Sequence, residues 1–113
     1  MPSALAANLE KLLGTPRDGA LLRYSLGMEY LKQGEAGRAI DYLREAVARD
    51  PGYSAAWKLL GKSLAEAGMA PQALEAYRSG IGAARAKGDK QLEKEMTVFA
   101  RRLERALAPE GPG

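Results

Sequence analysis

The reactive side chains of this sequence offer few combinations that could perform catalysis. Its 113 residues include neither His nor Cys, which excludes disulfides and thiolate metal sites and removes the commonest general base and zinc ligand. Asp41 and Glu45 lie one helical turn apart, but Arg38, Arg44 and Arg49 nearby make them more simply part of a balanced charged surface. The remaining carboxylate, Lys, Tyr and Ser side chains are not clustered. We therefore predict no enzyme, no cofactor and no metal site.

Two further sets of charged residues indicate binding rather than catalysis. Lys58 and Lys62 are one helical turn apart, so they could contact acidic groups of a ligand or could belong to a solvated helix face. Arg101, Arg102 and Arg105 could touch phosphates, but acidic residues interleave with them and no aromatic stacking platform accompanies them. Weak nucleic-acid binding through this C-terminal basic region is therefore only a remote alternative.

Charge is distributed unevenly along the chain. The formal net charge is +3, residues 1–77 are balanced, and residues 78–113 hold eight basic and five acidic side chains. This bias is far weaker than that of a dedicated nucleic-acid surface. No apolar run approaches the ~18 residues that span a membrane, and the first residues lack the basic region of a signal peptide. A cytoplasmic protein without a membrane partner is expected.

The elements that must position these residues are helices. Ala, Leu, Arg, Glu and Lys dominate, strand-like alternation is absent, and Gly and Pro divide the chain into helix-sized pieces. Ser3, Ser54 and Asp89 are expected N-caps, and Gly34 and Gly68 are expected helix stops. The spacing predicts helices over about residues 3–13, 18–33, 36–49, 54–68, 71–87 and 89–108. Residues 109–113 are predicted to form a disordered tail.

A period of 34 residues relates two parts of the chain, because residues 20–53 align with residues 54–87. Gly27 and Gly61 correspond and fall mid-helix, where Gly costs up to ~1 kcal/mol relative to Ala. A costly residue in both units indicates close helix–helix contact, with Ala39 and Ala73 as the small partners on the returning helices. The identical pairs are Leu26/Leu60, Gly27/Gly61, Gly34/Gly68, Ala36/Ala70, Ala39/Ala73 and Arg44/Arg78.

Both units carry a recognisable motif. The second unit reads Trp57-x2-Leu60-Gly61-x2-Leu64, then Ala73-x3-Tyr77. The first unit reads Leu26-Gly27-x2-Tyr30, then Ala39-x3-Leu43, then Pro51. These motifs resemble the tetratricopeptide repeat signature, W-x2-L-G-x2-Y, A-x3-F, P. The departures are Arg23 at the Trp position, Leu64 at the Tyr position, Leu43 and Tyr77 at the Phe position, and Arg85 at the closing Pro.

The resemblance implies an all-α fold, a right-handed solenoid of two helix–turn–helix repeats within one domain over residues 1–108. Because Arg85 replaces the closing Pro, the fifth helix should run on. Two repeats leave apolar faces open at both ends, so helices over about 3–13 and 89–108 are expected to cap them. Gly82, inside the fifth helix, is expected to allow the sixth helix to approach closely. The apolar stripe of the sixth helix is Leu92, Met96, Phe99, Leu103 and Leu107.

The resemblance also implies a function, since tetratricopeptide repeats bind peptides or helices in a concave groove lined by each unit's first helix. An apolar floor beside two cations suits an amphipathic helix or an extended acidic segment of another protein. Leu21 and Leu31 could instead pack on the N-terminal helix, and for Tyr24 and Met28 both interpretations stay open. The predicted partner-binding residues are Tyr24, Met28, Leu31, Lys58, Lys62, Leu92 and Met96.

One known subtype of the family is argued against. Chaperone-binding repeats hold a carboxylate with Lys, Asn and Arg, but the matching positions here are Tyr24, Met28, Leu59, Asp89 and Glu93. None fits, and the two acidic residues would repel a carboxylate. A structural alternative is self-association through the sixth helix or the open groove, with the chain a monomer or a weak homodimer.

Overall fold

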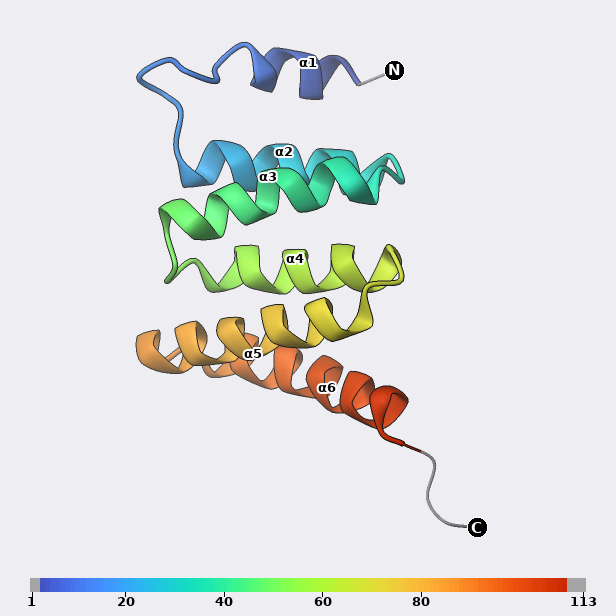
Figure 1. Ribbon diagram of the computed structural model, residues 1–113. Helices are drawn as coiled ribbons and strands as arrows, with labels where there is room; N and C mark the ends of the chain where they lie inside the picture. The colour runs from blue at the N-terminus through green and yellow to red at the C-terminus, as the bar shows by residue number, and fades with distance from the viewer. Residues whose placement is uncertain (1–2, 110–113) are drawn as a thin grey trace.

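The helices of this protein follow one another in a stack, as the computed structural model of the chain shows (Figure 1). The structure describes residues 3–109, and in that range it contains helices and no strand. In chain order they are α1 (Ala4–Glu10), α2 (Ala20–Lys32), α3 (Ala36–Arg49), α4 (Ser54–Glu66), α5 (Ala70–Lys87) and α6 (Lys90–Leu107). The predicted all-α helical solenoid is confirmed. The predicted disordered tail, apart from Pro109, lies outside the described residues.

Glycines end three of the helices in the same way. Gly34, Gly68 and Gly88 follow α2, α4 and α5 with φ values of 76°, 77° and 73°, a left-handed conformation that other residues rarely adopt. In each case the next residue donates its backbone N–H to a carbonyl five residues back, as Met69 does to Leu64 at 2.9 Å. This closure satisfies the free carbonyls of the helix end and turns the chain sharply. It explains why each hairpin needs so short a connection.

The first helix is shorter than predicted and the second begins later. The chain leaves α1 after Glu10 through tight turns, in which the Leu12 and Leu13 N–H groups bond to carbonyls three residues back. Asp18 does not start α2, because its carboxylate accepts the Gly14 N–H at 2.9 Å and pairs with Arg23 at 3.0 Å. The expected helix starter therefore holds the connecting loop together instead.

Close helix contact in each repeat involves a glycine and a large residue. A Cβ on Gly27 would lie 2.5 Å from Cγ of Leu43, and one on Gly61 would lie 2.7 Å from the ring of Tyr77. These positions correspond in the two repeats. The sequence argument named Ala39 and Ala73 as the small partners on the returning helices, but the atoms nearest to the glycines belong to Leu43 and Tyr77. Both alanines are buried, but the glycines make room for the bulky residues one turn later.

The two end helices cover the repeats. Ala6 of α1 is fully buried, and Glu10 accepts hydrogen bonds from the hydroxyls of Tyr30 at 2.6 Å and Tyr42 at 2.8 Å. At the other end, Met96 of α6 is fully buried and Ala100 is nearly so. Each end helix therefore closes the core of the repeat beside it.

Glycine also controls the approach of α6, but at a position other than the one predicted. Gly82 faces open space, whereas a Cβ on Gly80 would lie 2.7 Å from Cβ of Trp57 and would overlap the sulfur of Met96. The expected role of Gly82 is therefore wrong, and Gly80 takes that role. As expected, α5 runs on through Arg85 to Lys87.

Candidate functional site

The first helix of each repeat and α6 line a groove on one side of the stack. Helix α4 contacts both α2 and α6, so their exposed faces adjoin. Two neighbouring hollows lie along this line, and Leu59 and Lys62 contribute to both. One hollow, of about 220 Å³, is lined by Met28, Leu31, Lys32, Leu59, Lys62 and Glu66. The other, of about 290 Å³, is lined by Tyr24, Ala55, Lys58, Leu59, Lys62 and Leu92. We call the two hollows together the inner groove.

Six of the seven residues predicted to bind a partner line the inner groove. They are Tyr24, Met28, Leu31, Lys58, Lys62 and Leu92. The seventh, Met96, is placed wrongly by the sequence argument, because it is fully buried and packs against Gly80 between α5 and α6. The absence of a side chain at Gly80 admits the thioether into the core. Met96 therefore offers no surface to a partner.

The leucines on α2 behave differently from one another. Leu31 is half-buried and packs on the main core while it lines the groove. Leu21 is 67% exposed, so it does not pack on the N-terminal helix, and it lies outside both hollows. The residue that sequence reasoning passed over is Leu59, at the centre of the groove. The sequence could have predicted this residue, because alignment to the chaperone-binding subtype places position 59 among the ligand contacts.

Tyr24 forms one wall of the groove and is held from behind. Its ring centroid lies 5.0 Å from that of Tyr53, with the two planes inclined at 37°. Tilted aromatic pairs of this kind are favourable beyond their buried area. Burial raises the pKa of Tyr53 above its ordinary value. Tyr24 is half-buried and thus presents a supported, partly exposed ring to the groove.

Three lysines line the groove, Lys32, Lys58 and Lys62, and the two that were predicted to bind a partner, Lys58 and Lys62, differ in their electrostatic state. Lys58 forms an ion pair with Glu95 across α4 and α6. The hydrogen bond from Lys58, followed by that from Gln91, holds the pKa of Glu95 below its usual range. Lys62 forms no ion pair with any residue in the range 3–109. Lys62 is therefore the cation of this pair whose charge is available to an acidic ligand.

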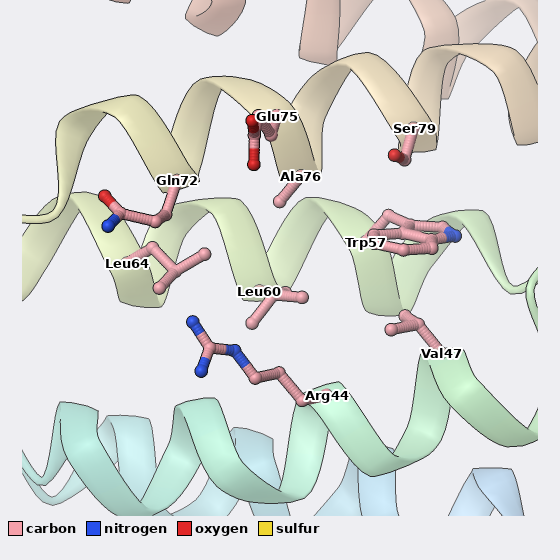
Figure 2. A pocket seen from close by; sticks show the side chains of 9 residues that line it. All are labelled: Arg44, Val47, Trp57, Leu60, Leu64, Gln72, Glu75, Ala76 and Ser79. Atoms are coloured by element: carbon pink, nitrogen blue, oxygen red, sulfur yellow. The ribbon is translucent and has the colours of Figure 1, made fainter.

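A third hollow opens on a different face, between α3 and α5 (Figure 2). Its volume is about 340 Å³, and α4 forms its floor with Trp57, Leu60 and Leu64. Leu60 and Leu64 are only 3% and 2% exposed, so they are already used by the core. Polar side chains, Arg44 and Glu75 among them, form its rim. This outer hollow offers less free apolar surface than the inner groove.

The described part of the chain shows neither a metal centre nor a membrane span. Among residues 3–109, no three or more acidic side chains gather where a metal ion could be held. Within the same range, no helix combines the length and the apolar character needed to pass through a bilayer.

Comparisons with known proteins agree with the helical repeat fold. The family model described as tetratricopeptide repeat matches residues 24–89, more than half of the chain. A curated relative, TPR repeat-containing protein PA0015 of Pseudomonas aeruginosa, is 52% identical over 98 residues, which cover 87% of this chain and 93% of the relative.

Solved structures give the same result. The solution structure of protein BPP2914 from Bordetella parapertussis superposes with a TM-score of 0.78 at 42% identity, covering 92% of this chain and 90% of that chain. A tetratricopeptide repeat domain protein from Salinibacter ruber superposes with a TM-score of 0.73 at 30% identity, covering 87% of this chain and 97% of that chain. The motifs, the paired helices and these relatives together identify the chain as a member of the tetratricopeptide repeat family.

Proposed function

We propose that the inner groove binds an amphipathic segment of another protein, with apolar side chains in its two hollows and a carboxylate on Lys62. Tetratricopeptide repeat proteins are in general interaction modules that use extended surfaces of this kind, and their role is generally that of a non-catalytic scaffold. The observation that carries the proposal is the continuity of the groove. Apolar surface from α2, α4 and α6 lies beside Lys62, which forms no ion pair with any residue in the range 3–109.

The chemistry of the groove favours a particular kind of segment. Tyr24 and Met28 are anchor types that adapt to a partner's shape while burying apolar area. An ammonium group beside such a floor favours a ligand that alternates apolar and acidic side chains, in a helix or an extended strand. A fully apolar ligand would leave Lys62 desolvated and unpaired, which is costly. The proposed ligand is therefore apolar on one face with at least one acidic group at its edge.

The experiment is a capture assay with a groove variant. Full-length protein carrying Tyr24→Ala and Met28→Asp is compared with wild type for retention of partners from native cells, identified by mass spectrometry. The captured partner's affinity is then measured with purified protein. The double variant should keep its helicity and lose the partner. If it unfolds instead, the two residues belong to the core and the site assignment fails.

Two further variants keep this test decisive. Lys62→Glu alters an exposed side chain and should weaken capture without affecting helicity. Gln72→Ala with Ser79→Asp changes the rim of the outer hollow by the same charge as the groove variant and should retain the partner. Light scattering on the purified protein separates this function from self-association through the same groove. Self-association would make the measured mass of the protein rise with concentration, whereas binding of another protein would not.

A further inference from the structure

The acidic and basic residues of helix α6 differ in whether they form ion pairs with other helices. Each of its acidic residues is paired with a basic residue of another helix. The pairs are Glu93 with Arg85 at 3.0 Å, Glu104 with Arg78 at 3.3 Å, and Glu95 with Lys58. The acids of α6 are thus neutralised from within the molecule, by α4 and α5.

The basic residues of α6 show the opposite behaviour. All of them are exposed, and none forms an ion pair with any residue in the described range 3–109. They are Lys90, Lys94, Arg101, Arg102 and Arg105. The excess positive charge of the C-terminal part of the sequence is therefore concentrated on one uncompensated helix face.

Most of these cations follow a straight line along the helix. Lys90, Lys94, Val98, Arg101 and Arg105 are separated by four, four, three and four residues. This spacing places them on one face, as in the seam of a coiled coil. Val98, at the centre of the line, is 48% exposed. We call these five residues the outer stripe.

The outer stripe lies on the face of α6 against which a further helix would pack if the stack of helices were longer. Helix α6 contacts α5 and, to a lesser extent, α4, and no other helix of the described chain. Met96 and Ala100, on the side that faces the protein, are buried. At the C-terminal end of the stack in Figure 1, the outer side of α6 is left uncovered by the other helices. A helix of a partner could therefore extend the stack at this face.

We propose that the outer stripe docks an acidic helix of another protein, separately from the ligand of the inner groove. Charge complementarity determines the sign of the partner, and the two arginines of the stripe, Arg101 and Arg105, can bind carboxylates with paired hydrogen bonds. A straight stripe with an apolar centre and a charged rim matches a helix whose carboxylates recur at the same spacing. A second copy would oppose the stripe with like charges, which is costly.

The direct test uses a defined probe. A synthetic helical peptide, with Glu at the spacing of the stripe cations and Leu opposite Val98, is titrated against the full chain at low ionic strength. Its Gln analogue serves as the uncharged comparison. The Glu peptide should bind, its affinity should fall as salt is added, and Lys94→Glu with Arg101→Glu should weaken it by about tenfold or more. Val98→Asp should also weaken it.

A matched control and two rival probes decide the outcome. Lys11→Glu with Arg17→Glu makes the same charge change on exposed residues far from α6 in sequence and should leave the affinity for the peptide nearly unchanged. Thermal melts should show all variants folded. Equal loss in the control and the stripe variant would overturn the proposal, as would tighter binding to a thymidine oligonucleotide or to phosphatidylserine vesicles. Failure of wild type to bind the Glu peptide at low salt would also overturn it.

Discussion

Gly61 lies directly beneath the ring of Tyr77, so closely that a Cβ on Gly61 would be 2.7 Å from both Cε1 and Cζ. The ring has little room to move, because Tyr77 is 3% exposed and stacks on Phe99 with centroids 5.5 Å apart. Gly27 and Leu43 repeat this relationship in the first unit. The mid-helix glycine of the motif is thus a packing requirement rather than a flexible point.

Substitution of Gly61 by Ala tests this requirement. Although Ala favours a helix by up to ~1 kcal/mol over Gly, the overlap with Tyr77 should give a net loss of ~1–3 kcal/mol in the free energy of unfolding. Gly82→Ala is the matched control, since Gly82 is helical and faces open space. That variant should gain ~0.5–1 kcal/mol. Chemical denaturation measures both, and similar values for the two variants would contradict the packing argument.

Truncation of two methionines tests the corrected position of Met96. Met96→Ala removes a fully buried side chain and should cost ~2–5 kcal/mol of unfolding free energy through the cavity it leaves. Met28→Ala alters a half-buried residue of the inner groove and should cost less than ~1 kcal/mol. Equal costs measured by denaturation would mean that the two residues share the same environment.

The stability that the Glu10 carboxylate contributes by holding α1 should depend on pH. The hydrogen bond from Tyr30, followed by that from Tyr42, lowers the pKa of Glu10 from its ordinary value of 4.5. A carboxyl group with a lowered folded pKa contributes stability above its unfolded pKa and loses that contribution as pH falls through its folded pKa. Below about pH 4.5, therefore, stability should decline through this group.

Glu10→Gln checks the origin of that decline. Thermal melts over a pH series should show the variant to be less stable than wild type near neutrality, with the difference shrinking in acid. Glu75→Gln is the control, since it removes an exposed carboxylate from α5. This variant should still lose stability in acid as wild type does, whereas Glu10→Gln should lack that part of the loss. A constant difference between wild type and Glu10→Gln at every pH would show that the hydrogen bonds do not depend on the charge.

The ion pair between Lys58 and Glu95 should contribute little to stability. Their side chains are 35% and 33% exposed, and pairs near the surface are typically worth ~0–1 kcal/mol. A double-mutant cycle with Lys58→Met and Glu95→Gln should therefore give a coupling free energy below ~1 kcal/mol, falling with added salt. A larger, salt-independent coupling would indicate that the pair locks α6 onto α4.

The sequence predicts helix ends well where glycine requires a left-handed turn, as at Gly34 and Gly68. It predicts less well where a side chain has two possible roles. Asp18 could cap α2, but its carboxylate bonds to Gly14 and Arg23 instead, and nothing in the linear pattern ranks those choices. The position of Gly80 relative to Met96 depends on how far α6 rotates about its axis. That rotation is set by packing across α5, not by the period of the stripe.

The inner groove was largely predictable because repeat periodicity fixes which face of each first helix is turned away from its partner. Tyr24 and Lys62 could be placed in this way. Leu92 and Met96 belong to α6, which lies outside the repeat, so the period gives no register for them. Only one of the two reaches the surface of the groove. Interhelical pairing, as between Lys58 and Glu95, was also beyond the sequence because it joins residues from a repeat and from a cap.

Glu10 accepts one hydroxyl from α2 and one from α3, and this has a consequence for the order of folding. The two tyrosine hydroxyls come together only when that hairpin has closed, and their rings then stack at 5.8 Å. In an open chain α1 therefore has no complete docking site. We expect its attachment to follow the closure of the first repeat, so that the N-terminal helix completes a hairpin already formed rather than nucleating it.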